Sequence, residues 1–426
     1  MLEKFIIKGG KPLKGEIEVG GAKNATFPIL AATLLTKEPC IIGNIPLVED
    51  VFKFIDILQA MGVDIEWLDK RKIKIQCKNI DPKKMPHEII KHFRGSVLFW
   101  GAILARFDNF KTASPGGCII GARPLDTHFD AFSQMGVDVK QKGKFYNFKK
   151  NIATLKNENE VKEEIVLEEF SVTATENVLL FSASLNKKIV LKIADQDYQV
   201  QELVKVLNKM GAKVKIVGAH IFEIEGKKNL KGFTHNIVSD PIEAGTFILL
   251  ALATKGEILV KNVDTEYLTL FFKKLKKLGA NIEFPDSRSV RILYSPKFTI
   301  DKIQSMPYPG IGTDLLPLFG VLATQTKGAT LIHDPLYEGR LKYLEELNKM
   351  GADIIFCDPH RAIINGPSHL KGIEVPSLDL RAGAALIIAG LIAQGVTTIN
   401  NVYQLDRGYE KIEERLQKLG ADIRRI

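Results

Sequence analysis

The chain has 426 residues, which at about 150 residues per domain corresponds to two or three domains with room for a large core. This length excludes a disulfide-stapled miniprotein, and the composition, with 45% hydrophobic and 26% charged residues, excludes a largely disordered chain. The net charge of +9 suits anionic small molecules as well as nucleic acid, and a solvated basic surface is the alternative interpretation.

The four cysteines lie far apart and form no CxxC pair. Their spacing argues against a structural zinc site and a disulfide framework, and it favours a reducing cytoplasm. The first residues reach Lys8 and two glycines before an apolar stretch of signal-peptide length can form, so we expect no secretion signal. The most apolar stretches fall short of the about 18 to 20 residues that span a membrane, and they predict buried helices.

A short phrase recurs six times along the chain: an aliphatic residue, Gly, a small or aliphatic residue, a polar residue, and then a predicted strand. Its glycines recur at intervals of 68 to 75 residues, and they are Gly62, Gly136, Gly211, Gly279, Gly351 and Gly420. This regularity predicts an internal repeat of about 72 residues.

Each phrase ends an amphipathic pattern, such as residues 201–210, and its glycine is the predicted helix stop. Between the phrases lie segments that are apolar almost all round and must be buried as helices: 25–35, 97–105, 178–185, 246–253, 315–323 and 383–393. Most are followed by a strand pattern, such as 256–262. Each repeat therefore predicts a helix-and-sheet module.

Six modules exceed one core, so we expect two groups of three with a crossing near residues 236–241. A cleft between two similar halves would be the default ligand site.

Charged and polar residues stand just before the predicted buried helices. Lys23, Arg94 and Arg381 are the cations among them, and a cation there opposes the helix dipole unless an anion is also present. Convergent helix starts with free N–H groups would form a phosphate or carboxylate site. Capping is the alternative, and it alone would explain any single one of Ser171, Thr313, Asp314 and Asp379.

A Gly/Pro-rich loop over residues 113–126 holds Cys118 and Arg123 five residues apart. Nearby positive charge lowers a thiol pKa, and the glycines would let the loop close over a ligand. The alternative is a small buried hydrophobe in a turn. Cys40, Cys77 and Cys357 lie in strand-like surroundings, where a structural role is favoured.

Several common chemistries lack their motifs. The chain contains no GxxxxGK[ST], HExxH or GxSxG, and its eight histidines have no ligand spacing. Gly310 and Gly312 begin like a dinucleotide fingerprint whose third glycine is absent. ATP hydrolysis, zinc proteolysis and serine-esterase chemistry are therefore unsupported.

The segments 21–25, 115–124, 240–246, 379–381 and 406–409 resemble the enolpyruvyl transferases, in the branch that acts on UDP-N-acetylglucosamine. The resemblance runs essentially end to end. It implies an α/β fold of two similar inverse α/β-barrel domains, each with three repeats of about 72 residues. The expected N-terminal domain is 22–238, with the Cys118 loop as lid; the C-terminal domain is 1–21 plus 239–426; and the active site lies in the cleft between them.

The reaction implied by the resemblance transfers the enolpyruvyl group of phosphoenolpyruvate to the 3′-hydroxyl of UDP-N-acetylglucosamine, releases phosphate, and commits the sugar to peptidoglycan. The implied catalytic residues are Cys118 as acid and thioether-forming thiol, Asp314 as base, and Lys23. The implied phosphoenolpyruvate-binding residues are Lys23, Arg94, Arg123, Arg381 and Arg407. The implied nucleotide-sugar-binding residues are Asn24, Arg94, Arg123, Pro124, Leu125, Ser171, Val172, Thr173, Asp314 and Leu336. Asp240 and Asp379 would support them, with no metal or organic cofactor.

The sequence departs from this family at two places. Thr173 stands where the family usually has Gly, in a segment that contacts the uridine diphosphate, so the approach of the backbone to the nucleotide is in question. Asp197-Tyr198-Gln199 stands where the family commonly has Glu-Pro-Glu.

Two rivals remain. The sister transferase that acts on shikimate 3-phosphate shares the fold and the donor, but it begins its first buried helix with Lys-Ser and has no cysteine loop, whereas this chain has Lys23-Asn24 and Cys118. A non-catalytic repeat protein that binds nucleic acid would need aromatic clusters or long basic runs, which the sequence lacks. We therefore expect a cytoplasmic monomer that binds two small-molecule substrates, and neither nucleic acid nor membrane.

Overall fold

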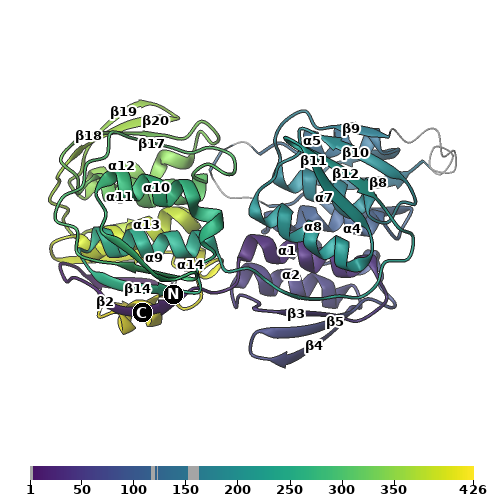
Figure 1. The fold of residues 1–426 in the computed structure, drawn as a ribbon, viewed down its shortest axis with the longest axis horizontal. Helices are drawn as coiled ribbons and strands as arrows, with labels where there is room; N and C mark the ends of the chain where they lie inside the picture. Colours follow the sequence, from purple (N-terminus) through teal and green to yellow (C-terminus); the bar gives the residue numbers. More distant parts are fainter. Residues whose placement is uncertain (1–2, 117–119, 122, 152–162) are drawn as a thin grey trace. The chain divides into compact units, whose positions relative to one another are not determined.

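The computed structural model describes residues 3–116, 120–121, 123–151 and 163–426. These residues form two compact units (Figure 1). Unit 1 contains 3–20, 120–121 and 239–426, and unit 2 contains 21–116, 123–151 and 163–238. Within the described part of the chain, no helix has the length and apolar character needed to cross a membrane.

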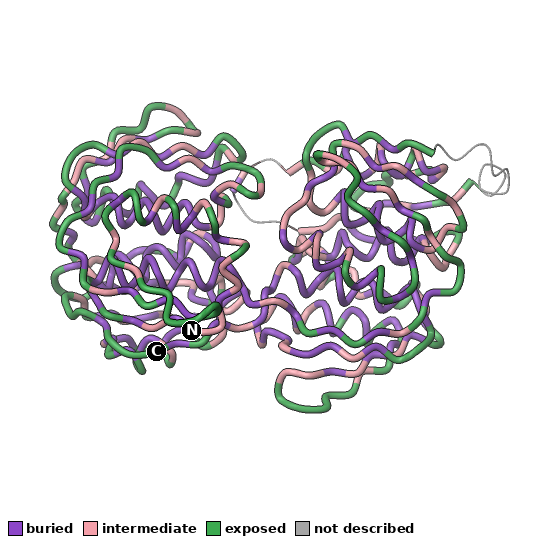
Figure 2. Tube along the Cα trace, in the orientation of Figure 1, coloured by how far each residue is buried: buried purple, intermediate pink, exposed green. Residues whose placement is uncertain are grey.

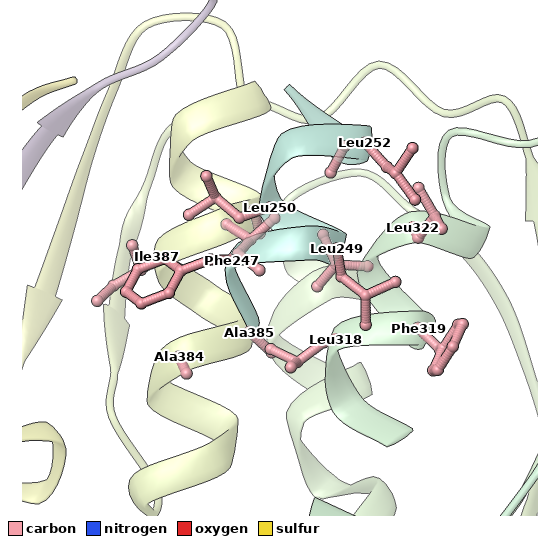
Figure 3. Packing of buried hydrophobic residues seen from close by; sticks show 14 of the residues in the cluster. Phe247, Leu249, Leu250, Leu252, Leu318, Phe319, Leu322, Ala384, Ala385 and Ile387 are labelled. Atoms are coloured by element: carbon pink, nitrogen blue, oxygen red, sulfur yellow. The ribbon is translucent and has the colours of Figure 1, made fainter. Parts of the chain in front are cut away.

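The six apolar segments fold as buried helices, as predicted. They are α1 (Lys23–Ala32) with η1 (Thr33–Leu35), η3 (Arg94–Leu98) with α4 (Phe99–Leu104), α7 (Val172–Ser182), α9 (Pro241–Ala253), η5 (Thr313–Leu315) with α11 (Leu316–Ala323), and α13 (Leu380–Ile392). In unit 1, α9, α11 and α13 pack on one another through Phe247, Leu318 and Ala384, among others (Figure 3). Every residue of α9 is buried, so apolar burial on all sides keeps this helix inside.

The six amphipathic patterns also fold as helices, each ending at its glycine phrase. They are α2 (Glu49–Ala60), α5 (Asp126–Gln134), α8 (Tyr198–Met210), α10 (Thr269–Leu278), α12 (Tyr343–Lys349) and α15 (Ile412–Lys418). The glycines after them have φ between 76° and 103°, the left-handed region that other residues rarely adopt. The predicted stops are confirmed for all six phrases.

Short helices connect these elements. They are η2 (Pro82–Lys84), α3 (His87–Ile90), η4 (Thr265–Leu268), η6 (Arg340–Lys342) and α14 (Tyr403–Asp406).

The described strands of unit 2 form three sheets around its helices. In spatial order they are β13 (Thr234–Asn236), β3 (Cys40–Gly43), β5 (Lys72–Gln76) and β4 (Asp64–Asp69); β6 (Asn109–Ala113), β8 (Phe145–Lys150) and β7 (Val137–Lys142); and β11 (Lys213–Gly218), β12 (Ile221–Glu225), β10 (Lys188–Lys192) and β9 (Glu164–Val166).

The described strands of unit 1 form three four-stranded sheets. In spatial order they are β15 (Ile282–Asp286), β16 (Ser289–Ile292), β14 (Glu257–Lys261) and β2 (Lys14–Glu18); β17 (Lys302–Gln304), β18 (Gly328–His333), β20 (Arg361–Gly366) and β19 (Asp353–Asp358); and β21 (Glu374–Pro376), β22 (Val396–Asn400), β1 (Lys4–Lys8) and β23 (Asp422–Arg425). Within each unit the apolar helices, such as α9, are buried, whereas the strands β4, β15 and β19 are mostly exposed (Figure 2).

Strand pairing explains which segments belong to each unit. β1 lies between β22 and β23, with Phe5 opposite Ile399 and Arg425, and β2 runs parallel to β14. Residues 3–20 are therefore part of the unit that ends the chain. β13 runs parallel to β3 and closes unit 2 just before the chain passes into unit 1 at residue 239.

Two details differ from the boundaries expected from sequence. Gly21 lies in unit 2, and Ile120 and Gly121, on the carboxyl side of Cys118, group with unit 1. The backbone N–H of Gly339 donates to the carbonyl of Ile120 at 2.9 Å, and this bond ties the loop residue to unit 1.

The glycine stops can be tested at Gly211, where φ is 102° and an added Cβ would lie 3.9 Å from the nearest atom, Cδ of Lys227. We expect Gly211→Ala to destabilise unit 2 by about 1–2 kcal/mol because of left-handed backbone strain alone. Gly211→Asn is the matched control, since Asn tolerates this conformation, and it should cost less. Denaturant unfolding of both variants measures the difference, and equal losses would contradict the strain explanation.

Candidate active site

Asp314 lies at the start of the buried helix α11, and it receives two guanidinium groups. Its Oδ1 accepts from Nη2 of Arg340 at 2.9 Å, and its Oδ2 accepts from Nε of Arg381 at 2.9 Å. The residue that caps η5 is Gly312, with no side-chain cap bond, so capping does not explain Thr313 or Asp314. The side chain of Asp314 is 25% exposed. We call Asp314, Arg340 and Arg381 the Asp314 cluster.

Arg340 is buried, with 4% of its surface exposed, and it contacts three side chains. Besides Asp314, its Nε donates to Oγ1 of Thr313 at 2.9 Å, and its Nη1 lies 3.9 Å from Oδ1 of Asp379. The hydroxyl of Thr313 in turn donates to Oδ2 of Asp334. The guanidinium plane is therefore fixed from several directions.

Arg381 is the second residue of α13 and is also buried, at 4% exposed. Burial alone would lower the pKa of Arg381, but Asp314, Tyr409 and Asp240 around it raise that pKa above its ordinary value. Its guanidinium also lies over the ring of Tyr409, 5.6 Å from the ring centre. Arg381 therefore stays charged.

Both supporting carboxylates, Asp240 and Asp379, are helix caps. Oδ1 of Asp379 accepts from the N–H groups of Arg381 and Ala382, at the start of α13. Oδ1 of Asp240 accepts from the N–H groups of Ile242 and Glu243, at the start of α9. Capping is therefore confirmed for Asp379, and Asp240 has the same role.

In unit 2, Lys23 opens α1 and pairs with Asp50. The Nζ to Oδ2 distance is 3.3 Å, and the two residues are 8% and 2% exposed. The N-cap of α1, Ala22, offers no side-chain bond. The anion beside this cation is thus a carboxylate of the protein itself, and Asn24 follows on the same helix.

A second group in unit 2 surrounds the start of α7. Nη2 of Arg94 donates to the carbonyl of Pro124 at 3.2 Å. Burial, and then Arg94 and Arg123, lower the pKa of His128 to about 3. Nε2 of His128 lies 3.1 Å from Oγ1 of Thr173. The structure thus brings Arg94, Arg123 and Thr173 into the surroundings of one histidine.

Ser171 is the N-cap of α7, and its Oγ accepts from the N–H of Ala174 at 3.4 Å. Capping is therefore confirmed for Ser171. Val172 follows it as the first residue of the helix. Leu125 is the N-cap residue of α5 and offers no side-chain bond.

The other candidate residues have different surroundings. Arg407 follows α14, and its Nη1 donates to Oε1 of Gln404 at 3.0 Å. Leu336 is 41% exposed in the segment between β18 and Arg340. Asp197, at one of the departures from the family pattern, is the N-cap residue of α8 without a side-chain cap bond.

The predicted reactive thiol, Cys118, lies outside the described residues. Cys40 and Cys77 are buried, and burial raises their pKa values to about 12 and about 11. Such thiols stay protonated, which agrees with the structural role expected of them. Cys357 is exposed on β19.

Sequence reasoning missed Arg340 and Asp50. Asp50 had a signal, because it is a charged residue on the buried face of an amphipathic helix. Arg340 had no such signal. It lies in the connection between strand β18 and the amphipathic helix α12, and not just before a buried helix.

The Asp314 cluster predicts a large cost for removing Arg340. We expect Arg340→Met to destabilise unit 1 by about 2–3 kcal/mol, because Thr313, Asp314 and Asp379 lose a hydrogen-bonding or charged partner. Arg361→Met is the matched control in the same unit, since Arg361 pairs with Asp358 at 55% side-chain exposure and should cost at most about 1 kcal/mol. Chemical unfolding of both variants measures the loss in the free energy of unfolding. Equal losses would show that Arg340 contributes no more to stability than an exposed ion pair does.

Comparisons with known proteins agree along the whole chain. The model of the EPSP synthase (3-phosphoshikimate 1-carboxyvinyltransferase) family matches residues 7–416. The UDP-N-acetylglucosamine 1-carboxyvinyltransferase of Treponema denticola is 39% identical over 429 residues, covering 99% of both chains. The same-named protein of Halothermothrix orenii is 40% identical over 423 residues, with 99% of both covered.

Solved structures show the same fold. An enolpyruvyl transferase from Streptomyces tendae matches 100% of this chain and 99% of its own with a TM-score of 0.87 and 21% identity. An EPSP synthase from Acinetobacter baumannii matches with a TM-score of 0.75, 18% identity and 100% of both chains covered. With full-length relatives at 36–40% identity, this chain belongs to the EPSP synthase family and, within it, to the UDP-N-acetylglucosamine 1-carboxyvinyltransferases.

Proposed function

We propose that this protein transfers the enolpyruvyl group of phosphoenolpyruvate to the 3′-hydroxyl of UDP-N-acetylglucosamine and releases phosphate. The observation that carries the proposal is the end-to-end identity of 36–40% to proteins named for this acceptor. The reaction supplies the committed sugar of peptidoglycan. We further infer that the protein works in the cytoplasm as a monomer.

The proposed chemistry is an addition followed by an elimination. In the addition, the thiol of Cys118 gives a proton to the methylene carbon of phosphoenolpyruvate while the sugar hydroxyl oxygen bonds to the neighbouring carbon. The carboxylate of Asp314 takes the proton of that hydroxyl. In the elimination, the thiolate of Cys118 takes a proton back from the new methyl group, and the carbon–oxygen bond to phosphate breaks, which restores the double bond. The proton held by Asp314 goes to the departing phosphate.

The surroundings of Asp314 suit a group that receives a hydroxyl. Two guanidinium groups orient its carboxylate, and each uses one of the lone-pair positions of a carboxylate. An acceptor hydroxyl can approach the 25% of the Asp314 side chain that is exposed. Asp314 would therefore first accept a hydrogen bond and then a proton.

Phosphoenolpyruvate carries a phosphate and a carboxylate, so its site needs several cations. We assign this role to Lys23, Arg94, Arg123, Arg381 and Arg407. In the described residues, Lys23 and Arg381 are already beside Asp50 and Asp314, which hold their charges in place.

We assign the nucleotide sugar to residues of both units. In unit 2 these are Asn24, Arg94, Arg123, Pro124, Leu125, Ser171, Val172 and Thr173. In unit 1 they are Asp314 and Leu336, with Asp240 and Asp379 in support. Asp240 and Asp379 support the site through hydrogen bonds that cap the N-termini of α9 and α13.

Phosphate release from phosphoenolpyruvate, measured with each of two acceptors, tests the proposal. We expect release with UDP-N-acetylglucosamine and none with shikimate 3-phosphate. Release only with shikimate 3-phosphate would assign the chain to the activity that names the family model, and release with neither would contradict both assignments.

Cys118→Ser provides a matched test of the acid, because a serine hydroxyl is a far weaker acid than a thiol. We expect its activity to fall sharply. Fosfomycin, an epoxide phosphonate that mimics phosphoenolpyruvate, should add its mass to the wild type in the presence of UDP-N-acetylglucosamine and leave Cys118→Ser unmodified. Cys40→Ser is the control, and it should still be modified. An unmodified wild type by mass spectrometry would exclude the proposed reactive thiol.

A further inference from the structure

Arg425 lies on β23, the last strand of the chain, and three carboxylates surround its guanidinium group. Its Nη1 donates to Oδ2 of Asp406 at 2.9 Å, and its Nη2 donates to Oδ1 of the same residue at 2.6 Å. Its Nε donates to Oε1 of Glu413 at 2.7 Å, and Nη2 donates to Oε2 at 3.2 Å. Nη1 also donates to Oε2 of Glu3 at 2.8 Å. All five N–H groups of the guanidinium are thus used on carboxylate oxygens.

The three carboxylates come from different segments of unit 1. Glu3 precedes β1, the strand that pairs with β23. Asp406 is the last residue of α14, and Glu413 lies in the first turn of α15. The two ends of the chain lie close together here (Figure 1). One side chain of the last strand therefore joins the N-terminal segment to two helices.

The contact between Arg425 and Asp406 is bidentate and partly shielded from water. The two side chains are 22% and 23% exposed. The hydrogen bonds to Asp406 are the largest cause that raises the pKa of Arg425 above its ordinary value, against the opposing effect of burial. A bidentate contact fixes the relative orientation of both groups, which a single-bonded surface ion pair does not. The position of the Asp406 carboxylate is therefore well defined.

Asp406 is followed directly by Arg407, one of the cations assigned to phosphoenolpyruvate. The backbone of Arg407 has φ −62° and ψ −20°, so it continues the turn of α14. The Asp406 and Arg407 side chains thus extend from consecutive residues of one turn. A contact that fixes Asp406 also fixes the backbone from which the Arg407 guanidinium extends.

The carboxyl side of Arg407 has its own anchor, Tyr409. Tyr409 is 1% exposed, and its backbone N–H donates to the carbonyl of Leu405 at 2.9 Å. The hydroxyl of Tyr409 lies 2.9 Å from Oγ1 of Thr246, on the buried helix α9. The core of unit 1 therefore holds the chain after Arg407, and the Asp406 carboxylate holds it before Arg407.

We propose that Arg425 is a positioning residue for phosphoenolpyruvate: its bidentate contact with Asp406 fixes the backbone of Arg407 and so places that guanidinium group for the substrate. The inference rests on the proposed function, which gives Arg407 its role. Arg425 acts through Asp406 and Arg407 and has no contact with the substrate in this proposal.

A purely structural role for Arg425 gives a different expectation. By joining β23 to α15 through Glu413, Arg425 would stabilise unit 1 whether or not it fixed Arg407. Glu413→Gln weakens that connection and leaves the two bonds between Arg425 and Asp406 in place. The two variants Arg425→Met and Glu413→Gln therefore separate stability from positioning.

Initial rates of phosphate release, with each substrate varied while the other is saturating, give both Michaelis constants. We expect Arg425→Met to raise the KM for phosphoenolpyruvate about tenfold, because Arg407 is no longer held in its binding position. The KM for UDP-N-acetylglucosamine should stay within about twofold and kcat within about threefold of the wild type. Glu413→Gln should lower the midpoint of denaturant unfolding and leave both KM values within about twofold.

Arg424→Met is the matched control, because Arg424 is the exposed neighbour of Arg425 on the same strand. It removes one positive charge from β23 and should change neither KM. A rise in the KM for phosphoenolpyruvate equal to that of Arg425→Met would show that net charge, and not the contact with Asp406, is responsible.

Arg425→Lys tests the geometry of the contact, and it keeps the proposal testable if Arg425→Met does not fold. Lysine keeps the charge but presents one ammonium group in place of the planar fork, so it cannot reproduce the bidentate contact. We expect Arg425→Lys to retain a raised KM for phosphoenolpyruvate. A wild-type KM in this variant would overturn the role of the bidentate contact.

The remaining outcomes separate the inference from the proposed function. An unchanged KM for phosphoenolpyruvate in folded Arg425→Met, an equal rise for both substrates, or an equal rise in Glu413→Gln would overturn the positioning role. A wild type that releases no phosphate with UDP-N-acetylglucosamine would instead contradict the proposed function, before any variant is compared.

Discussion

The pairing of Asp314 with two buried guanidinium groups is the constraint on which the proposed site depends. Arg340 and Arg381 are each 4% exposed, and a buried charge is stable only when it is paired. Asp314 supplies one carboxylate oxygen to each of them. Asp379 then caps the helix that carries Arg381. The orientation of the Asp314 carboxylate therefore follows from the packing of unit 1 before any substrate binds.

The repeated module explains why such charges lie at the starts of buried helices. Each module buries an apolar helix and ends an amphipathic helix at a glycine of positive φ, so helix ends and outer faces are the places where a charged side chain costs least. Unit 2 has two such arrangements at the starts of buried helices: Lys23 pairs with Asp50, and Thr173 is hydrogen-bonded to His128. In each case a side chain from another helix fixes a polar group at the start of a buried one.

Periodic features could be predicted from sequence, and long-range polar contacts could not. The six helix stops and six buried helices follow from local patterns, as do the caps at Ser171 and Asp379. Capping was the wrong alternative for Asp314, because its partners are 26 and 67 residues away. The bond between His128 and Thr173 spans 45 residues, and no local pattern encodes it.

The role of Asp314 is the central claim, and Asp314→Asn tests it most directly, because the amide keeps the shape and one acceptor oxygen. The measurement is phosphate release in a single turnover, together with the dissociation constant for UDP-N-acetylglucosamine. The account predicts binding within about tenfold of the wild type and a rate lowered by about 10²-fold or more, as expected when a general base is removed. A near-wild-type rate in Asp314→Asn would contradict the account.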